Sequence, residues 1–253
     1  MAATAVVLLH PFSLDRRFWQ PQLERLSASD PERVVAALDL RGFGQNQRGE
    51  LYESIDGHAR DVLAELDRLA IVRALFVGLS MGGYVALALH RLAPERVAGL
   101  VLANTTARAD DDERRAQRAE QARRYERDGI ATLPDEWIPA LVGPSASADL
   151  KLDLRRIMLE QSRFGVAAAL RMMAARPDAT GELSSIRVPV AVVSGEHDGL
   201  TPPRVLRDLA QSVPRAYLYE IPGVGHLSSL EAPEEFNVAL VRALALVEGE
   251  QEG

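Results

Sequence analysis

The segment GLSMGG, residues 78–83, places a serine where its hydroxyl could act as a nucleophile. It follows the apolar run ALFV and leads into YVALALHRLA, so Ser80 stands between a predicted strand and a predicted helix. Glycines on both sides permit a sharp turn, and the free N–H groups of a helix start favour a developing negative charge. The pattern predicts a nucleophilic serine. A glycine-rich turn in which Ser80 only caps the helix is the alternative.

A serine hydroxyl needs a base to remove its proton and an acid to orient that base. His226 lies in IPGVGHLSSLE, after the last predicted strand and therefore at the same sheet edge as Ser80. Asp198 lies in VVSGEHDGLTPP past another strand, whereas alternation turns Glu196 the other way. We expect the catalytic residues to be Ser80, Asp198 and His226. The other histidines lie in predicted helices (His58, His90), at a strand end (His10) or beside an acid (His197).

Acyl transfer also needs donors for a tetrahedral oxyanion. One expected donor is the backbone N–H of Met81, which directly follows the serine. The other should come from HPFSLD, the loop after the first predicted strand. Pro11 has no N–H, so we expect the oxyanion hole to consist of the amides of Phe12 and Met81.

The elements that must position these residues alternate along the chain. Short apolar runs, nearly continuous rather than alternating, suit strands covered on both faces of a parallel sheet. Segments of helical period separate them, at 18–26, 55–69, 84–92 and 236–247. The expected fold is therefore α/β, a mostly parallel sheet of about six strands with helices on both faces. The predicted strands are TAVVLL, RVVAALDL, RALFVGL, RVAGLVLA, VPVAVVSG and AYLYEIP.

This alternation breaks between residues 105 and 180, where the sequence predicts only helices. We expect a core of residues 1–104 and 181–253, with 105–180 inserted as a helical cap or lid over the site. Interspersed acids and arginines in this insertion favour solvated helix faces. Arg16, Arg17 and Arg163 could present a cation to an anionic lactone, although surface positions suit them better. The candidate substrate-binding residues, for which helix packing is the alternative, are Trp137, Leu141, Met158, Phe164 and Met173.

The composition narrows the class of protein. The chain has 253 residues, 47% hydrophobic and 26% charged, with a formal charge of −7 and no cysteine. The acidic balance argues against a nucleic-acid partner, and the absence of disulfides fits a reducing compartment. No secretion signal or membrane span is expected, so we predict a cytoplasmic protein, monomeric or homodimeric. No metal or other cofactor is expected. The terminal EGEQEG should fray.

Five blocks in order resemble the α/β-hydrolase superfamily: VVLLHPFSLDRRFWQPQL, DLRGFGQN, GLSMGGYVALAL, VSGEHDGLTPP and IPGVGHLSSLEAPEEF. The chain is most similar to the small lidded branch that contains carboxylesterases, 3-oxoadipate enol-lactonase and C–C bond hydrolases. The resemblance implies a nucleophile, an acid and a base at Ser80, Asp198 and His226. Serine at that position argues against the epoxide and dehalogenation reactions of relatives with an aspartate nucleophile.

The expected function is therefore serine-dependent hydrolysis of a small-molecule carboxylic ester or lactone through an acyl-enzyme. Two alternatives remain at this point. A C–C bond hydrolase would use the same residues on a vinylogous diketone, and the lid would decide between these substrates. A small-molecule receptor on the same fold would keep the residues and turn over generic esters slowly, because fold alone does not decide function.

Overall fold

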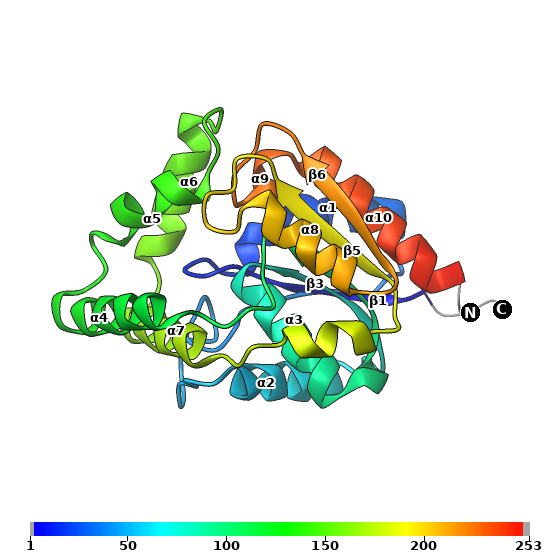
Figure 1. Ribbon diagram of the computed structural model, residues 1–253, viewed down its shortest axis with the longest axis horizontal. Helices are drawn as coiled ribbons and strands as arrows, with labels where there is room; N and C mark the ends of the chain where they lie inside the picture. The colour runs from blue at the N-terminus through cyan, green and yellow to red at the C-terminus, as the bar shows by residue number, and fades with distance from the viewer. Residues whose placement is uncertain (1–2, 250–253) are drawn as a thin grey trace.

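The computed structural model describes residues 3–249, which form one six-stranded sheet in which every neighbouring pair of strands is parallel. The strand order is β2-β1-β3-β4-β5-β6. Helices cover both faces, which confirms the predicted α/β class (Figure 1). The strands are β1 (Ala5–Leu9), β2 (Val35–Leu38), β3 (Ala74–Leu79), β4 (Val97–Ala103), β5 (Val190–Gly195) and β6 (Ala216–Ile221).

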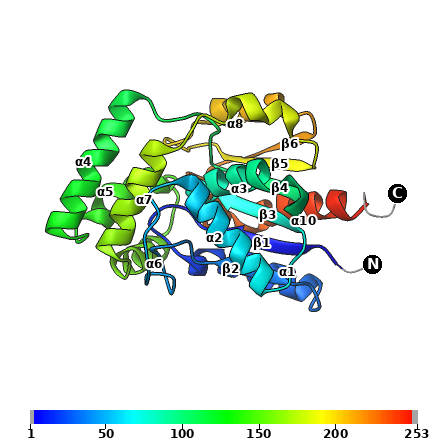
Figure 2. The same ribbon diagram turned by 90° about the horizontal axis from the view of Figure 1, so that it is seen from below.

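Two groups of helices enclose the sheet. The first and last long helices, α1 and α10, pack on one face, and α2, α3 and α8 pack on the other (Figures 1 and 2). Short 3-10 turns occupy Arg16–Trp19, Pro94–Arg96 and Thr180–Ser185. The helices of these two layers are α1 (Gln20–Ser29), α2 (Ile55–Arg68), α3 (Met81–Leu92), α8 (Pro203–Ser212) and α10 (Pro233–Gly249), with the short α9 (Ser228–Glu231) before α10.

Burial explains why the strands are continuous apolar runs. All of β3, β4 and β5 are buried, since side chains on both of their faces meet helices. The outer strands β2 and β6 are largely half-buried or exposed because each has only one neighbour. The buried strands β3 and β5 therefore fix the positions of Ser80 and Asp198, which follow their carboxyl ends.

The segment between β4 and β5 contains helices and no strand among its described residues, all of residues 105–180. Its helices stand together beyond the carboxyl ends of the strands, and α4 packs along α7 (Figure 1). No helix within residues 3–249 combines the length and apolarity that a membrane span requires. The segment EGEQEG was predicted to fray, but its first two residues, Glu248 and Gly249, belong to α10, and its last four lie outside the described residues. The inserted helices are α4 (Asp112–Asp128), α5 (Leu133–Leu141), α6 (Ala148–Leu159) and α7 (Arg163–Ala175).

Candidate active site

The serine turn adopts a backbone conformation that side chains rarely tolerate. Ser80 has φ 53° and ψ −113°, between the last residue of β3 and the first residue of α3. Its N–H donates to the carbonyl of Ala103 at 2.9 Å, and its own carbonyl accepts from the Thr105 hydroxyl at 2.8 Å. The Ser80 side chain makes no capping hydrogen bond to α3. Strain in a left-handed region, held by backbone bonds, is typical of functional positions.

The flanking glycines are required by close backbone approach. A Cβ atom on Gly82 would lie 2.0 Å from the carbonyl oxygen of Leu9, and one on Gly78 would lie 2.3 Å from that of Gly82. Any side chain would therefore force β3 and α3 apart, or push α3 away from β1. The turn holds its serine at the N-terminus of α3, where free N–H groups favour an anion.

His226 and Asp198 form a buried hydrogen-bonded pair. His226 Nδ1 lies 2.8 Å from Asp198 Oδ2, and the two residues are only 2% and 3% exposed. Asp198 Oδ1 accepts from the backbone N–H groups of Leu200 and Thr201, both at 2.9 Å. An ionised Asp198 only accepts, so it places the histidine proton on Nδ1 and leaves Nε2 able to take a proton. Glu196, by contrast, is exposed and accepts from Gly223 N–H.

A residue that the sequence motifs did not indicate completes this pair. Asn104, at φ 45° after β4, donates from Nδ2 to Asp198 Oδ2 at 2.9 Å and accepts from the Ser228 hydroxyl at 2.6 Å. Burial alone raises the pKa of the Asp198 carboxyl. The charge and hydrogen bond of His226, with donors from Thr201 and Asn104, hold that pKa below its ordinary value. Asp198 therefore stays ionised although it is buried.

Ser80 and His226 line one cavity of about 330 Å³, at the carboxyl edge of the sheet. Phe12 also lines it, from the loop after β1, and its ring packs against Trp137 with centroids 4.8 Å apart. Within residues 3–249 we find no hydrogen-bond partner for the backbone N–H of Phe12 or Met81. Two free amides near the serine turn are what an oxyanion needs.

The loop that carries Phe12 is held by a neutral histidine. Leu40 N–H donates to His10 Nε2 at 3.0 Å, so the ring proton lies on Nδ1 and bonds the Pro11 carbonyl at 2.9 Å. Burial lowers the pKa of His10, which keeps the ring uncharged. His10 is therefore a positioning side chain for this loop.

The predicted substrate-binding residues separate into two groups. Trp137, Leu141 and Met173 line the cavity. Met158 is fully buried in the insertion and Phe164 is half exposed, with the Arg163 guanidinium 4.8 Å from its ring centroid, and neither side chain lines the cavity. Met158 thus agrees with the helix-packing alternative, and Phe164 lies at the surface.

The cations predicted for an anionic substrate lie elsewhere. Arg163 stacks on Phe164, and Arg17 pairs with Asp15 at 2.7 Å and Glu160 at 2.6 Å. Arginines that the sequence placed on solvated helix faces instead line the cavity. They are Arg108, Arg114, Arg118 and Arg176.

The histidine loop is tied to the inserted helix α5. The carbonyl of Leu141 accepts from the N–H groups of His226 and Leu227, both at 3.0 Å. The Glu231 carboxylate accepts from Gly143 N–H at 2.6 Å and from Gly225 N–H at 3.1 Å. This carboxylate therefore bridges the end of α5 to the loop that holds the histidine.

Replacing Glu231 by glutamine should loosen that bridge. The amide keeps one accepting oxygen but turns an N–H₂ group toward backbone donors, so we expect a loss of about 1–2 kcal/mol in the free energy of unfolding. Urea denaturation measures it. The exposed Glu235→Gln variant on α10 is the matched control and should be unchanged. Equal stability of the two variants would contradict this role of Glu231.

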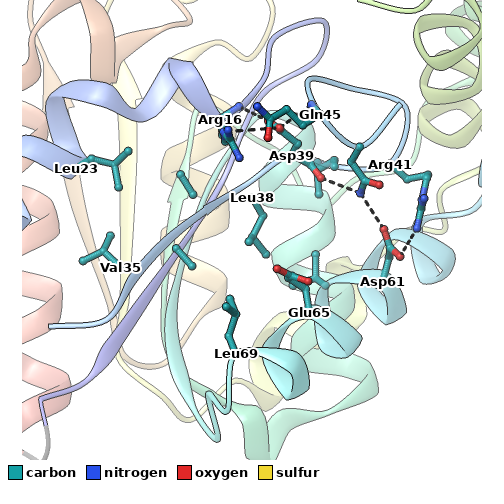
Figure 3. A pocket seen from close by; sticks show the side chains of 15 residues that line it. Arg16, Leu23, Val35, Leu38, Asp39, Arg41, Gln45, Asp61, Glu65 and Leu69 are labelled. Atoms are coloured by element: carbon teal, nitrogen blue, oxygen red, sulfur yellow. Dashed lines mark hydrogen bonds and ion pairs between the residues drawn. The ribbon is translucent and has the colours of Figure 1, made fainter. Parts of the chain in front are cut away.

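A larger hollow, of about 600 Å³, runs along the edge strand β2 and is separate from these residues (Figure 3). Its charged groups already have partners. Asp39 accepts from the N–H groups of Arg16 and Gln45, both at 2.8 Å, and Asp61 pairs with Arg41 at 2.8 Å. Its walls, all within residues 3–249, include neither serine nor histidine. Size alone therefore does not identify the site, since Ser80 and His226 line the smaller cavity.

Comparison with known proteins agrees with this fold and geometry. Residues 4–233 match the family model described as the alpha/beta hydrolase fold. The chain belongs to that family, and the resemblance to its esterase and lactonase branch is confirmed.

Two similar proteins have enol-lactonase names, and a third is an esterase. 3-Oxoadipate enol-lactonase 1 of Acinetobacter baylyi is 29% identical over 243 residues, 92% of this chain and 86% of that protein. The malate-bound structure of an esterase from Thermogutta terrifontis is 35% identical with a TM-score of 0.92, over 97% of this chain and 91% of that one. The enol-lactonase of Burkholderia xenovorans is 30% identical with a TM-score of 0.86, over 97% and 92% of the two chains.

Proposed function

We propose that this chain is a serine hydrolase of small carboxylic esters or lactones. Ser80 is the nucleophile, His226 the general base and Asp198 the acid that orients it. The observation that carries the proposal is the buried His226–Asp198 hydrogen bond of 2.8 Å. His226 lines the same cavity as Ser80, whose backbone is strained. The esterase and enol-lactonase relatives support an ester or lactone carbonyl as the reacting group.

The first half-reaction forms an acyl-enzyme. His226 Nε2 takes the proton of the Ser80 hydroxyl as its oxygen attacks the carbonyl carbon, and the C=O electron pair moves onto oxygen. The N–H groups of Phe12 and Met81 hold that oxyanion, and the ionised Asp198 stabilises the imidazolium. When the oxyanion collapses, the C–O bond breaks and the leaving alkoxide takes the proton from His226.

The second half-reaction returns the enzyme. His226 takes a proton from water, and the resulting hydroxide attacks the acyl carbon. Collapse of this second oxyanion releases the carboxylic acid, and the proton returns to Ser80. The helices of residues 105–180 act as the cap over this chemistry, because Trp137, Leu141 and Met173 reach the cavity from them.

A labelling experiment tests the proposal directly. A fluorophosphonate probe should modify the wild-type protein at one residue, with the adduct on the tryptic peptide that contains Ser80. Nitrophenyl esters, small lactones and a vinylogous diketone, assayed in parallel, should show turnover of the first two classes. Labelling elsewhere, or turnover of the diketone alone, would contradict the ester and lactone assignment.

A further inference from the structure

The wall of the active-site cavity formed by the insertion is positively charged. Four guanidinium groups and two carboxylates line the cavity, an excess of positive charge in a chain whose formal charge is −7. Charges that face a partly enclosed cavity attract ligands of the opposite sign. The lining arginines are Arg108, Arg114, Arg118 and Arg176, and the carboxylates are Asp110 and Asp111.

Two of these arginines, both buried, share the carboxylate of Asp110. Arg118 Nε lies 2.6 Å from one oxygen of Asp110, and Arg176 Nη2 lies 2.9 Å from the other. Both arginines are only 6% exposed. Burial raises the pKa of Asp110, but Arg176 and Arg118 hold it below its ordinary value, so the carboxylate is ionised. One buried carboxylate between two buried guanidinium groups leaves an excess of positive charge, which the exposed Asp178 offsets at longer range and which a bound anion would balance.

The hydrogen bonding of Arg176 points to the same deficit. Its guanidinium lies 4.2 Å from the ring centroid of Tyr84 and donates to the carbonyls of Met173 and Arg108. Its Nε atom is buried and has no hydrogen-bond partner among residues 3–249. An unpartnered N–H on a buried cation at the cavity is an unused donor for a ligand.

Arg114 supplies an unpaired cation one helical turn before Arg118. The i, i+4 spacing puts both on the same side of α4, and both line the cavity. Within the described chain no carboxylate lies within ion-pair distance of the Arg114 guanidinium. Asp111 is used otherwise, since its side chain caps α4 through Arg114 N–H at 2.8 Å. Burial lowers the pKa of Arg118, and the charge of Arg114 adds to this lowering, an effect that a bound anion would offset.

From this arrangement, and resting on the proposed function, we infer that the substrate carries a carboxylate held by the guanidinium groups of Arg114 and Arg118. Arg176, which shares Asp110 with Arg118 and lines the same cavity, adds a third positive charge to this site. The planar guanidinium fork matches the two oxygens of a carboxylate. The cavity of about 330 Å³ suits a short molecule, with the carboxylate at α4 and the reacting carbonyl at Ser80.

Two matched esters test the inference. Ethyl hydrogen succinate carries the carboxylate, and ethyl succinamate is its neutral isostere with an amide in that place. At neutral pH the wild-type enzyme should hydrolyse the first with kcat/KM at least about tenfold higher, as hydrogen bonds to a charged group imply. The preference should shrink as salt is added, since the ions screen a partly exposed guanidinium.

Variants of α4 locate the effect. Arg114→Gln should remove most of the preference, and Arg114→Lys should restore part of it, since a charge without the fork remains. Arg115→Gln is the matched control, because Arg115 pairs with Asp112 at the surface. Its ratio should equal that of the wild type. An unchanged ratio in both Arg114 variants would overturn the assignment.

Binding to Ser80→Ala separates this inference from the proposed function. Calorimetry should show the hemisuccinate binding at least about tenfold tighter than the amide, and Arg114→Gln should abolish the difference. Equal turnover of both esters by the wild type, with normal fluorophosphonate labelling, overturns the carboxylate site and leaves the hydrolase standing. Tight anion binding without turnover of either ester or labelling of Ser80 overturns the hydrolase.

Discussion

Ser80→Ala should lower ester turnover by about 10⁴- to 10⁶-fold, because the variant has no hydroxyl to form the acyl-enzyme. The small residual rate would come from the oxyanion donors and from substrate binding. Steady-state hydrolysis of a nitrophenyl ester measures the loss of turnover, and labelling by a fluorophosphonate measures the loss of the reactive hydroxyl. Activity within tenfold of the wild type would exclude Ser80 as the nucleophile.

The same substitution should leave stability nearly unchanged, since the Ser80 side chain caps nothing. A helix-capping serine supplies the contrast. Ser54 accepts from Gly57 N–H at 3.1 Å at the start of α2, so Ser54→Ala should cost about 1 kcal/mol of unfolding free energy and leave activity intact. This pair distinguishes the two interpretations of the turn. A helix cap at Ser80 would give the reverse pattern, with stability lost and turnover kept.

Asp198→Asn should lower kcat by about 10⁴-fold while the fold is kept. The asparagine amide can donate to His226 Nδ1, which moves the ring proton to Nε2 and removes the base from Ser80. Turnover across a pH series measures the loss. Glu196→Gln is the matched control, because Glu196 is exposed two residues away, and it should stay close to wild type. Similar rates in both variants would contradict the role of Asp198.

Acid unfolding gives an independent reading of Asp198. Its pKa is lowered in the folded state, so its contribution to stability is present above the unfolded pKa of about 4 and is lost as pH falls through the folded value. The wild type should therefore lose stability on acidification below about pH 4 more steeply than Asp198→Asn.

The fold and the histidine–aspartate pair were predictable because each depends on local pattern plus one rule of sheet geometry. Continuous apolar runs such as β3 and β4 identify strands buried on both faces. Parallel strands bring their carboxyl ends to one edge, which predicts that Asp198 and His226 should meet although 28 residues separate them. The turn at Ser80 follows from its glycines, which both make close contacts.

The cavity wall was not predictable in the same way. Helix α4 is so rich in charge that its sequence resembles a solvated helix, yet Arg118 is buried against Asp110. The partner Arg176 lies 58 residues beyond Arg118, past three other helices, and no periodicity links the two. No motif in the sequence indicated Asn104, whose side-chain amide donates to the Asp198 carboxylate. Tertiary packing decides such positions, and it leaves little trace in a single sequence.

The bonds between Leu141 and the histidine loop have a consequence for how molecules enter and leave. Any swing of α5 away from the sheet would pull on the N–H groups of His226 and Leu227 and on the Glu231 bridge. Opening of the cavity by that route would therefore displace His226, the proposed general base. Within residues 3–249 no hydrogen bond joins α4 to the loop that holds His226, so motion of α4 would let molecules enter and leave without disturbing that loop. Movement of α4 and the position of His226 would then be independent, so substrate could enter and product could leave while the His226–Asp198 pair stays in place.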